Sequence, residues 1–145
     1  MGSEMCIRDS FEIDLENHRI LVCEDSVSIA QIIVMVLEQK GAVVEHASNG
    51  LLGVQRCQAL KEKGKSFDLI IMDMQMPVMD GYKAASQLKA WAVDSPILAL
   101  TAQAIKEDES KCLAAGCDFY LTKPIDMANF VARVYEIISE FKKIV

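Results

Sequence analysis

The sequence predicts an α/β fold: one doubly wound sheet of five parallel strands in the order 2-1-3-4-5, covered by five helices. Three observations lead to this prediction. Apolar runs of strand length alternate with helix-length stretches five times along the chain. Connections of that length join parallel strands and place helices on both faces of the sheet. Right-handed crossovers then leave few topologies, and the order 2-1-3-4-5 is favoured for five such units.

The strands are predicted from short apolar runs. The third run is apolar without alternation as far as Met72 and stops at Asp73, which is typical of a strand that is buried on both faces. Pro77 and Gly81 close the loop that follows it. The five predicted strands are residues 19–23, 42–47, 67–72, 96–100 and 119–121.

The helices are predicted from their caps and from apolar spacing. Ser26 or Ser28 can cap the first helix, whose apolar residues recur every three or four positions until Gly41 ends it. Gly53 lies inside the second helix and weakens it slightly. The other four helices are predicted at residues 51–63, 81–91, 105–115 and 127–141.

Composition limits the function classes. The chain has 145 residues, of which 52% are hydrophobic, so it can form one domain with a full core. Its net charge of −6 argues against direct binding to nucleic acid, because there is no basic excess to neutralise phosphates. No apolar run approaches the roughly 20 residues of a membrane-spanning helix, so no direct membrane contact is expected.

The five cysteines form neither a C-x-x-C motif nor a zinc-ligand pattern. We interpret them as reduced thiols that serve as small hydrophobic residues, which favours a cytoplasmic location. Residues 1–10 differ from the rest of the chain and lack the apolar core of a secretory signal, and residues 11–17 are acidic and amphipathic, as the end of a linker can be. We therefore expect a leader or linker remnant at residues 1–17 and the folded domain at residues 18–145.

Charged and hydroxyl-bearing residues follow four of the predicted strands. They are Glu24 and Asp25 after the first strand, Asp73, Thr101 and Lys123. The carboxyl ends of parallel strands meet at one edge, so these side chains are expected to converge. One pair of carboxylates about 4 Å apart repels by about 4 kcal/mol at an effective dielectric constant near 20. A hard divalent cation relieves this repulsion, and oxygen ligands with room for water suit Mg²⁺.

Such a site could carry phosphoryl chemistry. A magnesium ion and the Lys123 ammonium would neutralise the phosphoryl oxygens while the Asp73 carboxylate attacks in line, giving an acyl phosphate. The Thr101 hydroxyl could donate a hydrogen bond to a phosphoryl oxygen. Taken singly, these residues also fit simpler roles. Glu24 and Asp25 could cap a helix, as could Asp73 and Thr101, and Lys123 could be an exposed loop residue.

Several motifs together resemble the response-regulator receiver domain of two-component signalling. Its phosphoacceptor strand and loop resemble residues 69–81 (LIIMDMQMPVMDG), and its acidic pair resembles Glu24-Asp25. Its switch hydroxyl and its lysine-proline motif resemble residues 99–102 (ALTA) and 121–125 (LTKPI). The resemblance covers about residues 18–143 and implies a flavodoxin-like fold. The loops look most like those of receivers attached to hybrid histidine kinases, so a fusion to such a kinase is possible.

The resemblance implies a role for each matching residue. Asp73 would accept a phosphoryl group from a phosphohistidine on a histidine kinase or a histidine phosphotransfer protein. Asp25 and Asp73 would bind Mg²⁺ directly, with the backbone carbonyl of Gln75 as a third ligand and Glu24 acting through water. Gln75 also occupies a position that tunes the phosphate lifetime in the family, as does Gln103, and the sequence does not give that lifetime.

The resemblance also implies a switch. Thr101 would move toward the phosphate while Tyr120 turns inward behind it. Lys123 would pair with the phosphate or with Asp73, and the Lys123-Pro124 bond is expected to be cis. The output would be a changed surface around the fourth helix, fifth strand and fifth helix, with a coupling free energy of about 1–3 kcal/mol.

Three functions are compatible with these motifs. The first is a phosphorylatable signalling switch that is not an enzyme beyond self-catalysed phosphotransfer and slow autodephosphorylation. The second is a degenerate receiver that acts as a non-phosphorylated interaction module, although all five matching positions are filled. The third is a phosphatase with an aspartyl nucleophile. Such enzymes resemble D-x-D at the acceptor strand, whereas Gln75 occupies the second position here and cannot transfer protons.

Overall fold

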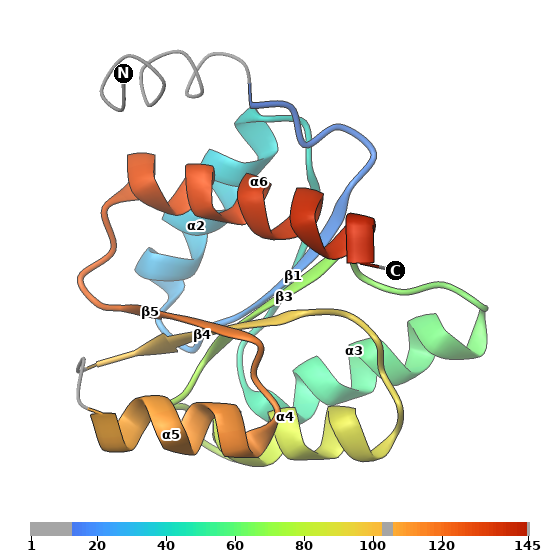
Figure 1. The fold of residues 1–145 in the computed structure, drawn as a ribbon, viewed down its shortest axis with the longest axis vertical. Coiled ribbons are helices and arrows are strands. Elements are labelled where there is room, and N and C mark those ends of the chain that lie inside the picture. The colour runs from blue at the N-terminus through green and yellow to red at the C-terminus, as the bar shows by residue number, and fades with distance from the viewer. Residues whose placement is uncertain (1–12, 103–105, 145) are drawn as a thin grey trace.

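Five parallel strands form one sheet in the order β2-β1-β3-β4-β5 in the computed structural model of the chain (Figure 1). The structure describes residues 13–102 and 106–144, with the backbone alone for 106–108 and 142–144. The strands are β1 (Arg19–Cys23), β2 (Val43–Ala47), β3 (Leu69–Asp73), β4 (Ile97–Thr101) and β5 (Phe119–Thr122). All four strand pairs are parallel, which confirms the predicted fold class and strand order.

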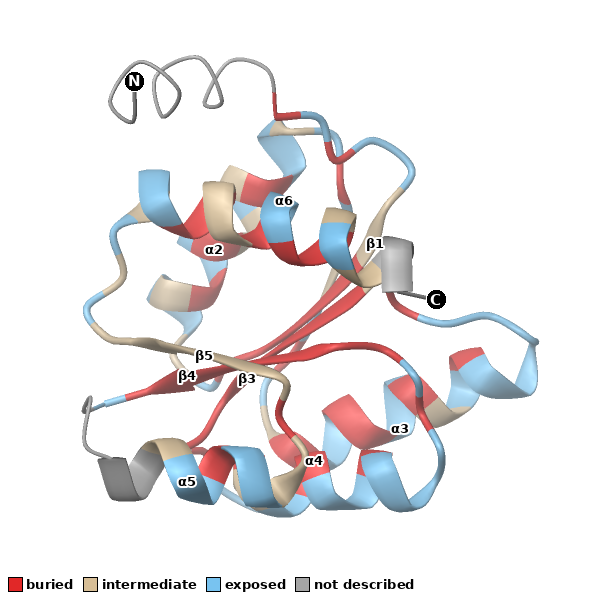
Figure 2. Ribbon diagram, in the orientation of Figure 1, coloured by how far each residue is buried: buried red, intermediate tan, exposed pale blue. Residues whose placement is uncertain are grey.

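The three central strands are the buried ones. Every residue of β3 and β4 is buried, and so is every residue of β1 except Arg19 (Figure 2). The edge strands β2 and β5 are partly exposed. Helices cover both faces of the sheet, so a central strand buries the side chains on both of its faces. Its sequence is therefore a continuous apolar run. The two polar residues that end β3 and β4, Asp73 and Thr101, are therefore carried on a rigid backbone.

Two layers of helices enclose the sheet. Helices α2 and α6 lie on one face, and α3, α4 and α5 lie on the other (Figure 1). The helices are α2 (Val27–Gln39), α3 (Gly50–Glu62), α4 (Gly81–Ala90), α5 (Lys106–Ala115) and α6 (Met127–Ile144). The predicted helices are thus confirmed, although α6 runs three residues further than expected, and residue 105 lies outside the described residues.

Side chains at the helix starts explain where three of the helices begin. Ser26 Oγ accepts a hydrogen bond from the Ile29 N–H at 3.4 Å, as predicted for the first helix. Asn49 caps α3 and Asp80 caps α4 in the same way, each through a side-chain oxygen 2.9 Å from a backbone nitrogen. Gly41 follows α2 with a φ of +97°, which suits a glycine at the end of a helix.

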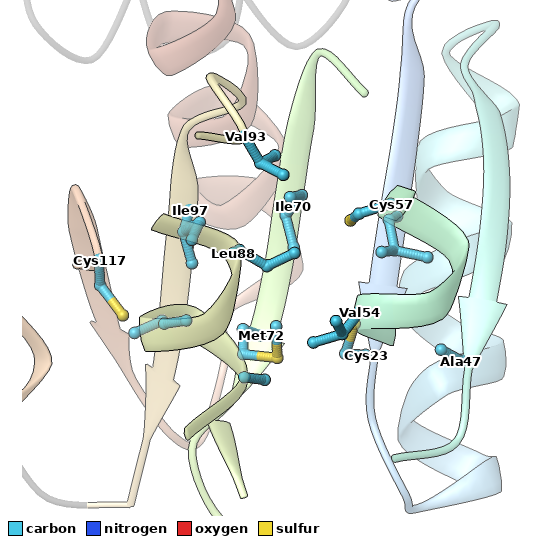
Figure 3. Packing of buried hydrophobic residues seen from close by; sticks show 14 of the residues in the cluster. Cys23, Ala47, Val54, Cys57, Ile70, Met72, Leu88, Val93, Ile97 and Cys117 are labelled. Carbon is cyan, nitrogen blue, oxygen red and sulfur yellow. The ribbon is translucent and has the colours of Figure 1, made fainter. Parts of the chain in front are cut away.

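Successive residues of each central strand pack in opposite layers. Figure 3 shows the layer under α3–α5, where Cys23 and Met72 of the sheet face Val54 of α3 and Leu88 of α4. The layer under α2 and α6 takes the alternate residues of the same strands, including Val22, and these pack with apolar residues of α6. This alternation follows from the two-residue period of a strand.

The described cysteines belong to the core. Cys23, Cys57, Cys112 and Cys117 are all buried and free, as predicted, and Cys6 lies outside the described residues. Burial raises the pKa of the Cys57 and Cys117 thiols to about 12, with smaller contributions from nearby charges. These thiols therefore stay protonated and act as small apolar groups.

Two residues upstream of the expected domain boundary also lie in the core. Leu15 is fully buried and Ile13 nearly so, in the layer under α2 and α6. The Leu15 N–H donates a hydrogen bond to the Lys40 carbonyl at 2.8 Å. The boundary at residue 18 stays a prediction, and residues 1–12 lie outside the described residues. Within the described part of the chain, the helices are too short or too polar to cross a membrane.

Candidate functional site

The predicted site residues lie at the carboxyl edge of the sheet. Asp73 and Thr101 are the last residues of β3 and β4. Glu24 and Asp25 follow β1 directly, and Lys123 follows β5 directly. Glu24, Asp73 and Thr101 are buried, whereas Asp25 is exposed. Three polar groups of this site are thus buried, and its exposed carboxylate, Asp25, lines an open pocket together with Gln75, so we call the site the acidic recess.

Three carboxylates of this recess form a cluster. Each of Glu24, Asp25 and Asp73 offers an oxygen that lies within 4.8 Å of the others. The residues Glu24 and Asp73 are only 1% and 3% exposed, so bulk water screens the repulsion between their carboxylates poorly. Oxygen atoms at this spacing, with one side open, form a donor set that suits a hard divalent cation such as Mg²⁺.

Lys123 neutralises part of the cluster. Its Nζ lies 3.3 Å from Asp73 Oδ2 and 3.3 Å from Glu24 Oε1. Burial lowers the pKa of the Lys123 ammonium, but the Asp73 and Glu24 carboxylates raise it by more, so the net shift is upward. The backbone also holds this residue, because its N–H donates to the Thr101 carbonyl at 2.7 Å. The Lys123-Pro124 bond is cis, as expected.

The negative charge of the Glu24 carboxylate is only partly compensated by its neighbours. Its Oε2 accepts a hydrogen bond from the Ser26 N–H at 3.2 Å, whereas Oε1 has no hydrogen-bond partner among the described residues and only the ion pair with Lys123. Burial raises the pKa of Glu24 from 4.5 to about 7. The Asp73 carboxyl adds to this shift, against the Ser26 N–H and the Lys123 charge. One ammonium does not balance three carboxylates, and a divalent cation would.

A prediction follows for the folding stability of the metal-free protein. Between pH 4.5 and about 7, folded Glu24 keeps a proton that the unfolded chain has released. This group's contribution to stability is therefore fully present below pH 4.5 and is lost as the pH rises through about 7. The loss is on the order of 3 kcal/mol, because each unit of pKa difference is worth about 1.4 kcal/mol.

Urea unfolding in EDTA at about pH 5 and about pH 8 checks this prediction. Glu24→Gln removes the titrating group and keeps an oxygen for the Ser26 N–H. Its unfolding free energy should depend less on pH than that of the natural protein. Equal pH dependence in the two proteins would contradict the assignment of the raised pKa to Glu24.

The loop after β3 orients Asp73. The Gln75 N–H donates to Asp73 Oδ1 at 3.1 Å, so the carboxylate lies between this N–H and the Lys123 ammonium. Gly81 allows the start of α4 to approach the strand end closely. A Cβ at Gly81 would lie 2.5 Å from the Asp73 carbonyl oxygen, which is closer than side-chain atoms come to backbone. The glycine of the predicted loop is thus required by the packing that holds Asp73.

The predicted switch residues lie on neighbouring strands. Thr101 is 3% exposed, and its Oγ1 donates to the Leu121 carbonyl at 3.5 Å. Tyr120 is half-buried against the layer under α3–α5. A hydrogen bond from its hydroxyl to the Glu109 carboxylate of α5, with a smaller effect of burial, raises the pKa of the phenol. The switch roles stay predictions, and Gln103 lies outside the described residues.

One residue of the site was not predicted. The Nε2 atom of His46, next to last in β2, lies 2.8 Å from the backbone carbonyl oxygen of Glu24. The sequence around His46 contains no cluster of ligands that would single this residue out. The predicted strand order does place β2 beside β1, so a polar residue near the end of β2 could have been assigned to the same edge.

The fold and the acidic recess together define a receiver domain of two-component signalling. The chain belongs to the response regulator receiver domain family, whose model matches residues 20–135. The receivers of this family are signalling switches rather than classical enzymes. The predicted resemblance is therefore confirmed at the level of the family.

Three relatives illustrate this membership. Histidine kinase 1 of Arabidopsis thaliana is 36% identical over 83% of this chain, and the match spans only 13% of that kinase. The receiver domain of the sensor histidine kinase PA1611 of Pseudomonas aeruginosa, with a magnesium ion in its active site cleft, is 31% identical, with a TM-score of 0.74 over 84% of this chain and 98% of that one. The Saccharomyces cerevisiae complex of the phosphotransfer protein Ypd1 with the Ssk1 receiver matches at 28% identity, with a TM-score of 0.77 over 86% of this chain and 90% of the matched one.

Proposed function

We propose that this receiver accepts a phosphoryl group on Asp73 from a phosphohistidine, in a Mg²⁺-dependent reaction that changes its surface for signalling. The observation that carries this proposal is the environment of the Asp73 carboxylate. It is buried at the end of a central strand, 3.3 Å from the Lys123 ammonium, and lies within a cluster of three acids. This arrangement favours a nucleophile beside positive charge rather than a structural carboxylate.

The donor set supports a magnesium site. Asp25, Asp73 and the backbone carbonyl of Gln75 would hold the ion, with Glu24 acting through water. The close carboxylate oxygens and the unbonded Oε1 of Glu24 fit this role. The related PA1611 receiver, with magnesium in its active site cleft, supports it further. Bound Mg²⁺ would supply positive charge to the carboxylates and to the phosphoryl oxygens.

The residues of the chain then have defined parts in the transfer. An oxygen of Asp73 attacks the phosphorus, and the bond between phosphorus and the histidine nitrogen of the donor breaks. The nitrogen leaves with the electron pair, and an acyl phosphate forms on Asp73. Lys123 offsets the charge of the phosphoryl oxygens, and Thr101 donates its hydroxyl to one of them. Gln75 has no acidic side chain to activate water, so fast hydrolysis is not expected.

Phosphorylation would bias the surface made by α5, β5 and α6 through Thr101 and Tyr120. The partner would be a histidine kinase or a histidine phosphotransfer protein. The matches to hybrid histidine kinases and to a receiver in complex with Ypd1 support this choice. Fusion to a hybrid kinase, a cytoplasmic location, and the lack of direct contact with nucleic acid or membrane belong to the same proposal.

A direct test is to incubate the chain with acetyl phosphate and Mg²⁺ and to measure its intact mass. We expect a gain of one phosphoryl group that is labile to hydroxylamine, as an acyl phosphate is, and no gain when EDTA replaces Mg²⁺. A chain that binds Mg²⁺ but gains no mass would instead be a degenerate receiver that acts as an interaction module. Rapid repeated consumption of acetyl phosphate would indicate a hydrolase.

A further inference from the structure

The hydrogen-bond ladder between β1 and β2 ends at Glu24, the first of the two acids that follow β1. The Glu24 N–H donates to the Ala47 carbonyl at 3.0 Å, which continues the ladder by one bond beyond the strand. In a parallel pair the next bond would bring a backbone N–H from two residues further along β2, which is Asn49. Asn49 instead begins the next element as the N-cap of α3. Among the described residues, no backbone N–H therefore donates to the Glu24 carbonyl.

The side chain of His46 provides a donor at this place. Its Nε2 lies 2.8 Å from the Glu24 carbonyl oxygen. A carbonyl oxygen only accepts hydrogen bonds, so Nε2 must carry the proton of this contact. The backbone of Glu24 is then held from β2 on both sides, through its N–H by Ala47 and through its carbonyl by His46.

We infer that His46 is a positioning residue, which fixes the Glu24-Asp25 turn so that its carboxylates stay close enough to Asp73 to share one ion. This inference rests on the proposed magnesium site. The three carboxylates repel one another when no cation is bound, and this force pushes the exposed Asp25 outward. A hydrogen bond that anchors the backbone between the two acids opposes that movement and preorganises the ligands.

The position of His46 separates this role from a role in folding. The residue is exposed, and it lies on the edge strand β2 rather than in either core layer. Its substitution should therefore change metal affinity more than stability. Glutamine is the conservative replacement, because its side-chain NH₂ reaches about as far as Nε2 and also donates.

The test compares Mg²⁺ binding by the whole chain and by three variants, measured by calorimetry, with thermal unfolding in EDTA as a second readout. His46→Leu removes the donor and should weaken Mg²⁺ binding roughly fivefold, the effect of one ordinary hydrogen bond. His46→Gln should stay within about twofold of the natural protein. His18→Gln is the matched control, because His18 lies just before β1, at the amino ends of the strands and away from the carboxylates. This variant should bind Mg²⁺ with unchanged affinity.

Each outcome decides the inference. Weaker binding in His46→Leu alone, with an unfolding temperature close to that of the natural protein, supports it. Equal affinity in His46→Leu and the natural protein overturns it. Equal loss in the Leu and Gln variants also overturns it, because the donor would then not be the cause. If the natural protein itself binds no Mg²⁺, the proposed metal site fails and this inference fails with it. If the natural protein and all variants instead bind Mg²⁺ equally well, the metal site stands and only the role of His46 is refuted.

Discussion

Replacement of Asp73 by asparagine is expected to abolish phosphoryl uptake from acetyl phosphate and from a phosphohistidine protein. Asparagine keeps the shape of the side chain and an oxygen for the Gln75 N–H, which now lies 3.1 Å from Asp73 Oδ1. It removes the anionic oxygen that attacks phosphorus, and it removes one carboxylate from the cluster. Intact-mass measurement in the presence of Mg²⁺ should show no added phosphoryl group in the variant.

Asp80→Asn provides the control for this experiment. Asp80 lies in the same loop but outside the acidic cluster, and it caps α4 by accepting a hydrogen bond from the Lys83 N–H at 2.9 Å. Asparagine caps a helix about as well, so the fold should be kept. This variant should gain one phosphoryl group at the natural rate. A phosphorylated Asp73→Asn protein would place the acceptor on another residue and would refute the assignment.

The sequence alone was sufficient to predict which residues lie together at the carboxyl ends of the strands. A run such as that before Asp73 has no polar alternation, so it must be buried on both faces, and this requires a parallel sheet with helices on both sides. Once the strand order follows from the crossovers, the convergence of Glu24, Asp73 and Lys123 follows as well. The prediction works because it needs only the periodicity and the chain direction, and both are local properties.

Contacts that depend on the paths of loops could not be predicted from the sequence. The sequence predicts that Gly53 weakens its helix slightly, and the structure shows that this glycine is also buried where α3 crosses β1. A Cβ there would lie 2.6 Å from the Cys23 sulfur, so the glycine allows close packing. The bond from His46 to the Glu24 carbonyl depends in the same way on where the chain leaves β2. A side-chain donor in place of a ladder bond leaves no trace in residue periodicity.

The replacement of Lys123 by methionine should have the next largest effect on phosphoryl uptake. Methionine keeps most of the length of the side chain and removes its charge, so neither the phosphoryl oxygens nor the acids retain an ammonium. We expect the initial rate of mass gain from acetyl phosphate with saturating Mg²⁺ to fall by about 10²–10³, the usual effect of losing one preorganised charge at a reacting centre. An unchanged rate would exclude Lys123 from the reaction.

The same variant should also reveal how the charges of the recess are balanced. The Lys123 ammonium lowers the pKa of Glu24, so its loss leaves two buried carboxylates that keep hydrogen bonds from the Ser26 and Gln75 N–H groups but have no ammonium beside them. Metal-free stability should fall by roughly 2 kcal/mol, less than for a fully buried pair because the Lys123 side chain is 27% exposed.

Lys89→Met is the matched control, because its ammonium lies at the same 3.3 Å from Asp118 in a more exposed ion pair. The free energy of unfolding of the metal-free Lys89→Met protein should fall by less than about 1 kcal/mol. Mg²⁺ should restore more of the stability lost in Lys123→Met than in Lys89→Met, since only the first change leaves acids that a cation at the cluster can neutralise.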